Sequence, residues 1–345
     1  MKLQQKVSLF VFLGFIIWLF IWALFIPKEN LSDRIQRTIK QQEKKADLSF
    51  SQVTFEEITN GKKYWALTAQ KADINKSTQI ATLKDSNGSF YKKGKEVLRF
   101  KSPAALWDMS KKEIFLDKPL GYDVKLENKI DDLIEKIKNL PASRQVKKSI
   151  FTLPQSYKGK TGYWFLAKNL SWRLINKQLV CDGGISLTKG NVTGIAQKLS
   201  GDVAMERVTL SGKPKIVIFQ NKSAPITMEA KTFAIISNKD TILAKGNPKI
   251  TWQTATINAR EMTYFQGINS LNLLGSVKVK YNDIEAVGDS AQYFAESGKI
   301  VLSGQAKATQ GENKLNGKKV IVSLKDQKIS VVGRGKVIIS EEEIN

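Results

Sequence analysis

Apolar and polar residues alternate along most of the chain after residue 48. Around Gly304, one set of alternate positions is apolar and the intervening set is mostly polar: Ile300, Leu302, Ala306 and Ala308 against Val301, Ser303, Gln305 and Lys307. Successive side chains of a β-strand point to opposite faces, so this pattern predicts strands with one buried and one solvated face. Gly, Asn, Asp and Lys between the runs mark turns. We therefore expect an all-β fold of antiparallel sheets whose apolar faces turn toward each other, as a sandwich, a jelly roll or an open barrel.

A glycine recurs at a constant interval in the C-terminal half of the chain. Gly246, Gly275, Gly304 and Gly333 follow one another at steps of 29 residues, and a related segment surrounds Gly212. A constant period of this size indicates stacked copies of one supersecondary unit, so the fold should be elongated. Glycine within an apolar strand face suits a bend or bulge, or the close approach of a bound ligand. Of these two interpretations, we favour the bend.

An apolar segment near the N-terminus predicts a membrane anchor. Segment 7–26 is an uncharged run of 20 residues, which matches the ~20 residues that a helix needs to cross a bilayer. Lys2 and Lys6 precede it, and no cleavage site with small residues follows. We expect a single-pass anchor whose short N-terminus lies in the cytoplasm; a cleaved signal peptide is the alternative. Both interpretations place the rest of the chain outside the cytoplasm, which argues against nucleic acid as a partner.

Two further segments have helical spacing. In the polar stretch 28–47, Leu31, Ile35 and Ile39 recur every four residues behind Ser32, a candidate N-cap. We expect a helical stalk there, either a docking surface or a spacer on the lipid surface. From 128 to 140, apolar residues again follow a helical period, and Pro141 comes next. We expect this amphipathic helix to cap an open end of the sheet.

These segments divide the chain into five predicted parts. They are an anchor at 1–27, a stalk at 28–47, a β-module at 48–126, a helical insertion at 127–159 and a second β-module at 160–345. A local similarity supports the two modules, since Tyr64-Trp65 after Gly61 resembles Tyr163-Trp164 after Gly162.

Composition narrows the chemistry. The chain has 55 Lys and Arg against 32 Asp and Glu, a net charge of +23, which would attract phosphate-bearing partners or only keep the protein soluble. It contains no histidine, the usual general base and the commonest metal ligand, and Cys181 is its single cysteine. The acids on polar strand faces, such as Asp108, Glu113 and Asp117, are expected to be solvated. We therefore expect no catalytic residue, no cofactor and no metal site.

Several motifs resemble known families. The predicted anchor, followed by Tyr64-Trp65-Ala66-Leu67-Thr68-Ala69-Gln70-Lys71-Ala72 and Ser86-Asn87-Gly88-Ser89-Phe90-Tyr91, resembles the LptC family, the membrane-anchored periplasmic component of lipopolysaccharide export. The later copies, such as Ala291 and Tyr293 leading to Leu302-Ser303-Gly304, resemble the OstA-like repeat of LptA.

The resemblance implies a slotted, elongated β-jellyroll, anchored in the inner membrane and periplasmic in its bulk. Such a protein would take lipopolysaccharide, or a related glycolipid, from an inner-membrane ABC transporter complex. It would pass the lipid to a periplasmic LptA-like or outer-membrane LptD-like bridge protein. The long OstA-like extension leaves open whether a separate soluble bridge protein is needed.

The inward positions of the predicted strands are candidates for a lipid-binding groove. They are Trp65, Leu67, Ala69, Leu83, Phe90, Ile114, Leu116, Leu210, Ile216, Leu273, Val277, Val279, Ile300, Leu302 and Ala306. Each methylene group left in water costs about 0.8 kcal/mol, so an acyl chain of about 12 carbons costs roughly 10 kcal/mol unless sheltered. Lysines at the rim are expected to contact lipid phosphates. Two alternatives stay open, namely a carbohydrate-active β-solenoid enzyme and a structural scaffold with a filled core.

Overall fold

The computed structural model describes residues 31–42, 46–126, 162–219 and 224–338. These residues form 22 strands of one antiparallel sheet, which confirms the all-β prediction. The predicted membrane segment and the predicted helix at 128–140 lie outside the described residues. Within the described part, no helix combines the length and the apolar character needed to cross a membrane.

The elements follow one another in this order. They are α2 (Leu31–Gln42), β1 (Leu48–Thr59), β2 (Lys62–Asn75), β3 (Ile80–Lys92), β4 (Lys95–Asp108), β5 (Glu113–Asp117), β6 (Leu120–Tyr122), the 3-10 helix η1 (Val124–Leu126), β7 (Tyr163–Arg173), β8 (Gln178–Lys189), β9 (Val192–Asp202), β10 (Arg207–Ser211), β11 (Lys215–Ile218), β12 (Ile226–Glu229), β13 (Thr232–Ile236), the 3-10 helix η3 (Ser237–Lys239), β14 (Thr241–Lys245), β15 (Lys249–Trp252), β16 (Ala255–Asn258), β17 (Glu261–Phe265), β18 (Ser270–Tyr281), β19 (Ile284–Phe294), β20 (Lys299–Gln310), β21 (Asn313–Ser323) and β22 (Lys328–Ile338).

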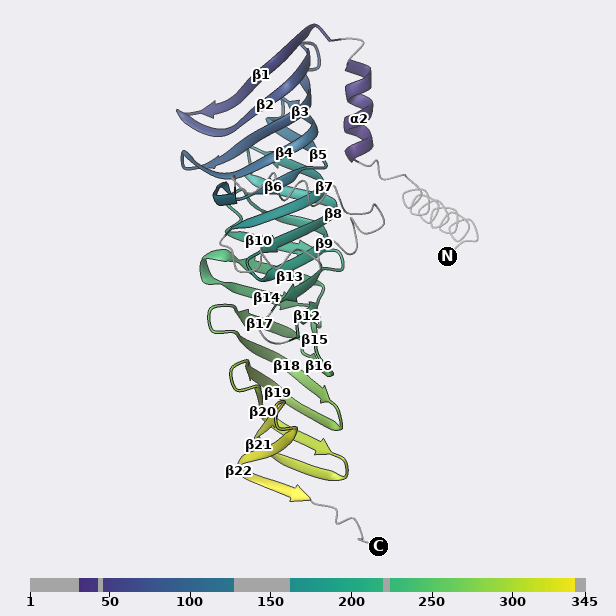
Figure 1. Ribbon diagram of the computed structural model, residues 1–345, viewed down its shortest axis with the longest axis vertical. Helices are drawn as coiled ribbons and strands as arrows, with labels where there is room; N and C mark the ends of the chain where they lie inside the picture. The colour runs from purple at the N-terminus through teal and green to yellow at the C-terminus, as the bar shows by residue number, and fades with distance from the viewer. Residues whose placement is uncertain (1–30, 43–45, 127–161, 220–223, 339–345) are drawn as a thin grey trace, which may run out of the picture.

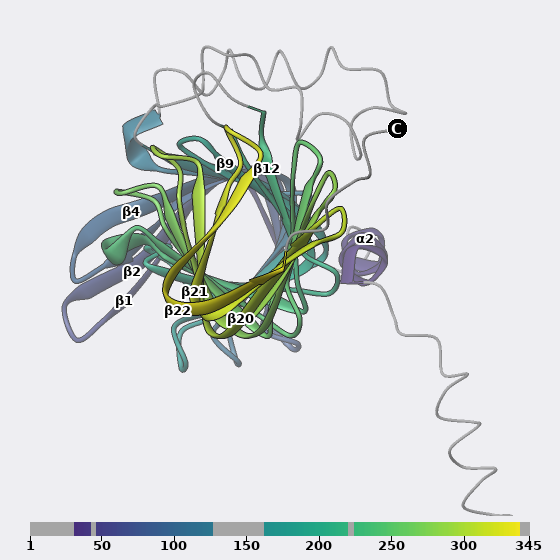
Figure 2. The ribbon, with the colours of Figure 1, turned by 90° about the horizontal axis from the view of Figure 1, so that it is seen from below.

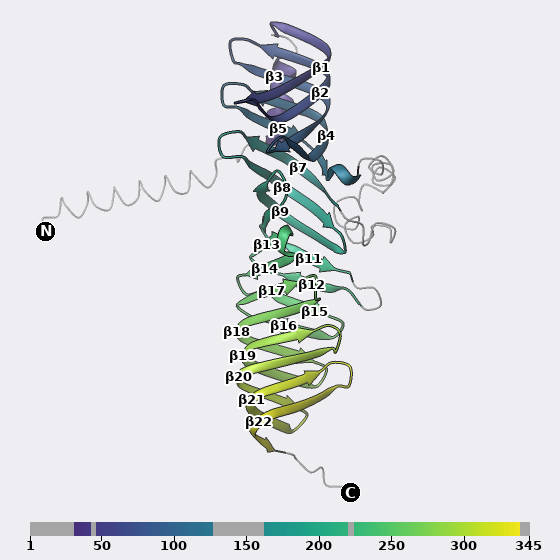
Figure 3. The ribbon, with the colours of Figure 1, turned by 90° about the vertical axis from the view of Figure 1, so that its left-hand side faces the viewer.

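The strands stack into an elongated molecule with β1 at one end and β22 at the other (Figure 1). Viewed from the side, successive strands run across the stack (Figure 3). The burial of β18 shows why the sequence alternates, since Leu271, Leu273, Val277, Val279 and Tyr281 are all buried. The apolar set predicted from alternation is therefore the inner set in this strand.

Each long strand bends near its middle, and the bend divides the sheet into two walls. In β18 the pairing with β19 shifts register between Leu274 and Val277, and in β20 the pairing with β21 shifts between Ser303 and Ala306. Elsewhere the chain breaks at the bend, so β10 and β11 together correspond to one long strand. Wall A contains β5, β10, β13, β14 and β17, and wall B contains β6, β11, β12, β15 and β16. The long strands contribute one half to each wall.

The recurring glycines lie at this bend. Gly275 has a φ of 78° and Gly304 a φ of 73°, a conformation that residues with a Cβ rarely adopt. A Cβ on Gly304 would also collide with the Asp289 side chain of the neighbouring strand. The bend interpretation is therefore correct, because the glycine stands at a bulge where the strand changes walls.

Opposite the bend, two rows of hairpin turns face each other along a line that we call the seam. The turns of wall A are 76–79, 109–112, 174–177, 203–206, 237–240, 266–269, 295–298 and 324–327, and those of wall B include 60–61, 93–94, 190–191, 253–254, 282–283 and 311–312. Viewed along the long axis, the strands wind around it and α2 lies outside (Figure 2). The seam is thus the side on which the two walls are not joined by continuous strands.

The two predicted β-modules form one continuous sheet. β4 pairs with β5 and with β6, and both of these short strands pair with β7. The segment between the predicted modules therefore does not interrupt the strand stack.

Helix α2 packs on the outside of wall A, which agrees with the prediction of a helix in the stalk. Ile35 and Ile39 are buried against Ala104, and the Arg34 guanidinium lies 6.0 Å from the centre of the Phe115 ring. Ser32 lies in the first described turn of the helix, and its hydroxyl donates to Asp117. The helix is thereby held against the sheet by apolar and polar contacts.

Candidate functional site

The predicted groove residues all lie in the interior between the two walls. Each is buried, and all belong to one hydrophobic cluster that runs along the stack. Wall A contributes Leu83, Ile114, Leu116, Leu210, Leu273, Ile300 and Leu302, and wall B contributes Trp65, Leu67, Ala69, Phe90, Ile216, Val277, Val279 and Ala306. The structure brings these side chains together; that a lipid binds them stays a prediction.

Side chains of the two walls touch across this interior. The Phe90 ring on wall B lies 5.4 Å from the Trp172 ring on wall A, and the Trp65 ring lies 5.1 Å from the Trp107 ring. Leu302 is fully buried. An acyl chain placed here has to replace contacts between the walls, so the walls must move apart to admit it.

A small cavity lies where the two walls meet at the seam. Its volume is about 10 Å³, and it is lined by Leu187, Lys189, Val192, Gly194, Ile235, Ile242 and Gln266. A cavity of this size holds about one water molecule.

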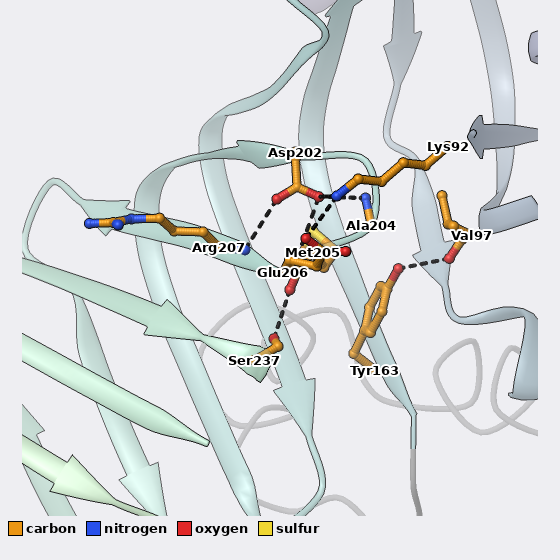
Figure 4. A network of polar contacts seen from close by, with 9 residues as sticks. All are labelled: Lys92, Val97, Tyr163, Asp202, Ala204, Met205, Glu206, Arg207 and Ser237. Carbon is orange, nitrogen blue, oxygen red and sulfur yellow. Dashed lines mark hydrogen bonds and ion pairs between the residues drawn. The ribbon is translucent and has the colours of Figure 1, made fainter. Parts of the chain in front are cut away.

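An ion pair crosses the seam in the N-terminal half of the molecule (Figure 4). Lys92, at the end of β3 in wall B, places its Nζ 2.8 Å from Glu206 Oε2 and 3.7 Å from Asp202 Oδ1. Both acids flank the β9–β10 turn of wall A. The hydrogen bond to Glu206 raises the pKa of the Lys92 ammonium group above its ordinary value, and burial opposes this effect.

A second set of polar contacts crosses the seam further along the stack. Lys189 Nζ of wall B lies 3.9 Å from Asp240 Oδ1 of wall A, and the Gln266 side-chain amide donates to Asn191 Oδ1 at 2.7 Å. Burial lowers the pKa of Lys189, and the negative charges of Asp240 and Asp123 partly offset this effect.

Additional side chains close both ends of the seam. Near β1, Lys112 of wall A lies 3.2 Å from Glu57 of wall B. Toward β22, Tyr281 of wall B donates its hydroxyl to the Leu324 carbonyl oxygen of the opposite row at 2.9 Å. Each of these contacts involves a side chain and none is a strand pairing, so the walls can separate here without breaking a β-ladder.

Sequence reasoning did not identify the residues of the seam. The partners Lys92 and Glu206 are separated by more than a hundred residues, and no local spacing relates them. The sequence does place Lys92 beside a predicted turn. This position alone does not indicate which turn of the other wall lies opposite.

The acids expected on the solvated surface are in fact buried. Asp108, Glu113 and Asp117 are exposed by only 4%, 2% and 1%. Each has its own partners, because Lys111 pairs with Asp108 at 3.0 Å, Arg173 pairs with Glu113 at 2.6 Å, and Gln36 donates to Asp117 at 3.1 Å. The prediction of solvation was wrong, and at Asp117 the reason is that α2 covers the outer face of wall A, where Ser32 and Gln36 donate to the carboxylate.

Two observations on the described residues bear on metal binding and catalysis. Among them, no group of three or more His, Cys, Asp or Glu residues could hold a metal ion. A hollow of about 230 Å³ beside the bend is lined by Ser276, Val277, Lys278, Val287, Gly288, Asp289, Gln305 and Lys307. Its lining includes one carboxylate, whereas glycoside hydrolysis ordinarily uses two.

Comparison with known proteins identifies one family. Residues 227–328 match the family described as "LptA/(LptD N-terminal domain) LPS transport protein". The match covers part of the segment that resembles the OstA-like repeat and none of the N-terminal motifs, so the resemblance to LptC stays a prediction.

A solved structure is also similar. It is described as LptH, the LptA-homologous periplasmic component of the lipopolysaccharide transport device of Pseudomonas aeruginosa. It is 19% identical, the alignment covers 34% of this chain and 96% of that chain, and the TM-score is 0.32. No curated protein matches the chain.

Proposed function

We propose that the chain is a non-catalytic conduit for lipopolysaccharide or a related glycolipid. In this proposal the acyl chains lie between walls A and B, which part along the seam. The observation that carries the proposal is the single apolar cluster, which both walls line from β2 to β21. The family match over residues 227–328 supports a role in lipopolysaccharide transport.

The shape of the interior suits this cargo. An acyl chain of about 12 carbons loses roughly 10 kcal/mol of unfavourable hydration when it is enclosed. Each strand of the stack turns an apolar face inward, so a lipid can move along the stack while its tails stay sheltered. The protein then needs no chemistry of its own, and an ATP-driven transporter supplies the work.

Both ends of the stack offer a partner the edge of a strand. β1 pairs with β2 on one side, and β22 pairs with β21 on one side, within the described residues. Each end strand therefore has a free edge to which another sheet can add a strand. Val337 and Ile338 of β22 are exposed by 53% and 43%. We place an LptA-like or LptD-like bridge protein at this end.

The β1 end is assigned to the inner membrane. The predicted anchor precedes α2, and α2 packs beside β3 and β5, in the same part of the stack as β1 (Figure 1). A single-pass anchor joined to α2 would hold this end close to an inner-membrane ABC transporter complex. Lipid would then enter near β1 and leave near β22, in the periplasm.

Photo-crosslinking in cells tests this function. A photoreactive residue is placed at Leu302 or Val277, which face the interior. In a third variant it is placed at Ser303, the neighbour of Leu302 in β20, which faces outward. We expect lipid adducts at Leu302 and Val277 and none at Ser303. Circular dichroism of each purified variant controls for folding. Equal labelling at the three positions, or none at any of them, would contradict the conduit and favour a structural scaffold.

A further inference from the structure

Two lysines of wall B stand on the seam opposite acids of wall A. Lys92 meets Glu206 and Asp202, and Lys189 meets Asp240. The lysine side chains are exposed by 34% and 30%, so each is reachable from solvent, and each stands where the two walls meet. This position is the border at which a lipid with enclosed tails would hold its headgroup.

The two acids that face Lys92 differ in how firmly they are held. Asp202 is fixed by the turn, because its carboxylate accepts from the backbone N–H of Ala204 at 2.9 Å and of Arg207 at 3.2 Å. Glu206 reaches Lys92 with a side chain that is 53% exposed. Ion pairs of exposed side chains are weak, so Glu206 is the partner that a stronger anion can displace.

The partner of Lys189 across the seam is held loosely. Asp240 stays 3.9 Å away and is 62% exposed, while burial lowers the pKa of Lys189. Lys189 also lines the small cavity between the walls, together with the apolar side chains of Leu187 and Ile242. An ammonium group above an apolar floor matches a molecule that joins a phosphate to acyl chains.

We propose that Lys92 and Lys189 form a phosphate-binding row on the seam, and that lipid phosphates displace Glu206 and Asp240 as the seam opens. This inference rests on the proposed function and names the chemistry by which the conduit recognises its cargo. The ion pairs close the seam when it is empty. The same lysines hold the headgroup when acyl chains part the walls.

If phosphate displaces Glu206 from Lys92, removing the acid and removing the lysine should change the affinity for lipid in opposite directions. Glu206→Ala removes the competing carboxylate and leaves Lys92 for phosphate, so lipid binding tightens by up to about fivefold. Lys92→Ala removes the phosphate contact, so binding weakens by about tenfold. If the pair served only to hold the fold together, both substitutions would change binding in the same direction.

The experiment uses the full-length chain in mild detergent and measures binding by fluorescence anisotropy. The probes are labelled hexa-acylated lipid A with two phosphates, the same lipid after enzymatic dephosphorylation, and inorganic phosphate as competitor. The variants are Lys92→Ala, Glu206→Ala, Lys189→Ala and Asp240→Ala. Glu261→Ala is the matched control, because Lys245 and Glu261 form a 3.5 Å ion pair between β14 and β17 at the bend, away from the seam.

We expect the phosphorylated lipid to bind tighter than the dephosphorylated lipid, and the opposite effects of the acid and lysine variants to vanish with the dephosphorylated lipid. Competition by inorganic phosphate alone, with equal affinity for the two lipids, would show a site for free phosphate and overturn the proposal. Changes in the same direction for Lys92→Ala and Glu206→Ala would also overturn it. If neither lipid binds the wild-type chain, the conduit function itself fails.

Discussion

The ring of Trp252, at the end of β15 in wall B, lies 5.8 Å from the ring of Tyr293 in the part of β19 that belongs to wall A. The contact joins the two rows of turns at the seam in the C-terminal half. Here aromatic side chains connect the walls, whereas nearer the N-terminus the ion pair Lys92–Glu206 does so. Tyr293 is buried, and this burial raises the pKa of its hydroxyl to about 12. Ring packing therefore holds the two rows together at this point.

Fixing the walls at this contact should block lipid entry. In a Trp252→Cys/Tyr293→Cys variant, a short bis-maleimide joins the walls, and we expect lipid labelling at Leu302 to fall at least about tenfold, since ring contacts at this distance leave no room for a chain. Cys181 is buried, and burial raises the pKa of its thiol, so it should not react. Adduct yield on denaturing gels is the measurement.

The control for this experiment joins two residues of one wall. Lys280→Cys/Glu285→Cys places the reagent across a single hairpin, where Lys280 and Glu285 are paired in register. Labelling at Leu302 should continue after this second cross-link. Undiminished labelling in the Trp252/Tyr293 variant would mean that lipid enters without movement of the seam.

Gly304→Ala should destabilise the protein. The residue has a φ of 73°, and an added Cβ would meet the Asp289 side chain. We expect a loss of about 1–3 kcal/mol in the free energy of unfolding, from backbone strain together with collision. Urea denaturation followed by circular dichroism measures it. Gly311→Ala is the matched control, with a φ of 57° and no atom within 4 Å of the added Cβ. A loss at Gly311 as large as that at Gly304 would show that the collision contributes nothing.

Asp73→Asn should remove an acid-sensitive part of the stability. Although burial acts to raise it, the pKa of Asp73 is lowered below its ordinary value of 3.8 by hydrogen bonds from Ser49 at 2.5 Å and Lys71 at 3.0 Å. Because the folded pKa is the lower one, the stabilisation is complete well above pH 3.8 and is lost as the pH falls through the folded value.

We therefore expect Asp73→Asn to cost about 1.5–3 kcal/mol at pH 7 and progressively less as the pH falls below about 4. Thermal unfolding between pH 2 and pH 7 provides the test. Asp283→Asn, in an exposed turn, serves as the comparison and should leave the profile of the wild type unchanged. A cost for Asp73→Asn that does not depend on pH would rule out the ionised carboxylate as its source.

Ile35→Ala should release helix α2 without melting the sheet. Ile35 is 1% exposed and packs with Ile39 against wall A. Loss of this contact costs about 2–5 kcal/mol, and an isolated helix of this length is marginal in water. Amide hydrogen exchange in 31–42 should accelerate while the strands keep their protection. Lys40→Ala, on the exposed side of the helix, should change neither. Equal acceleration in α2 and the strands would place α2 within the cooperative core.

The alternation of apolar and polar residues, together with the glycine interval, was sufficient to predict which side chains face the space between the walls. Leu302 and Val277 face inward as expected, because alternation and the glycine interval are local properties that survive in the strand stack. The seam was not predictable in the same way. Lys92 meets Glu206 only because the bends of many strands set the two walls at a particular angle, and no single segment encodes that angle.

Buried acids illustrate a second limit of the pattern. Alternation assigns Asp117 correctly to the outer face of its strand, yet α2 covers that face and donates to Asp117 through Ser32 and Gln36. The pattern reports which side of a sheet a residue occupies. It does not report which other element lies on that side.

The glycine interval also sets the height of the molecule. Each step of 29 residues, from Gly275 to Gly304 and from Gly304 to Gly333, adds two neighbouring strands to each wall. Neighbouring strands are about 4.8 Å apart, so one step extends the stack by about 10 Å. Duplicating or deleting one such unit would lengthen or shorten the protein by that increment while preserving both end strands, which makes reach across a gap a property that evolution can adjust in whole repeats.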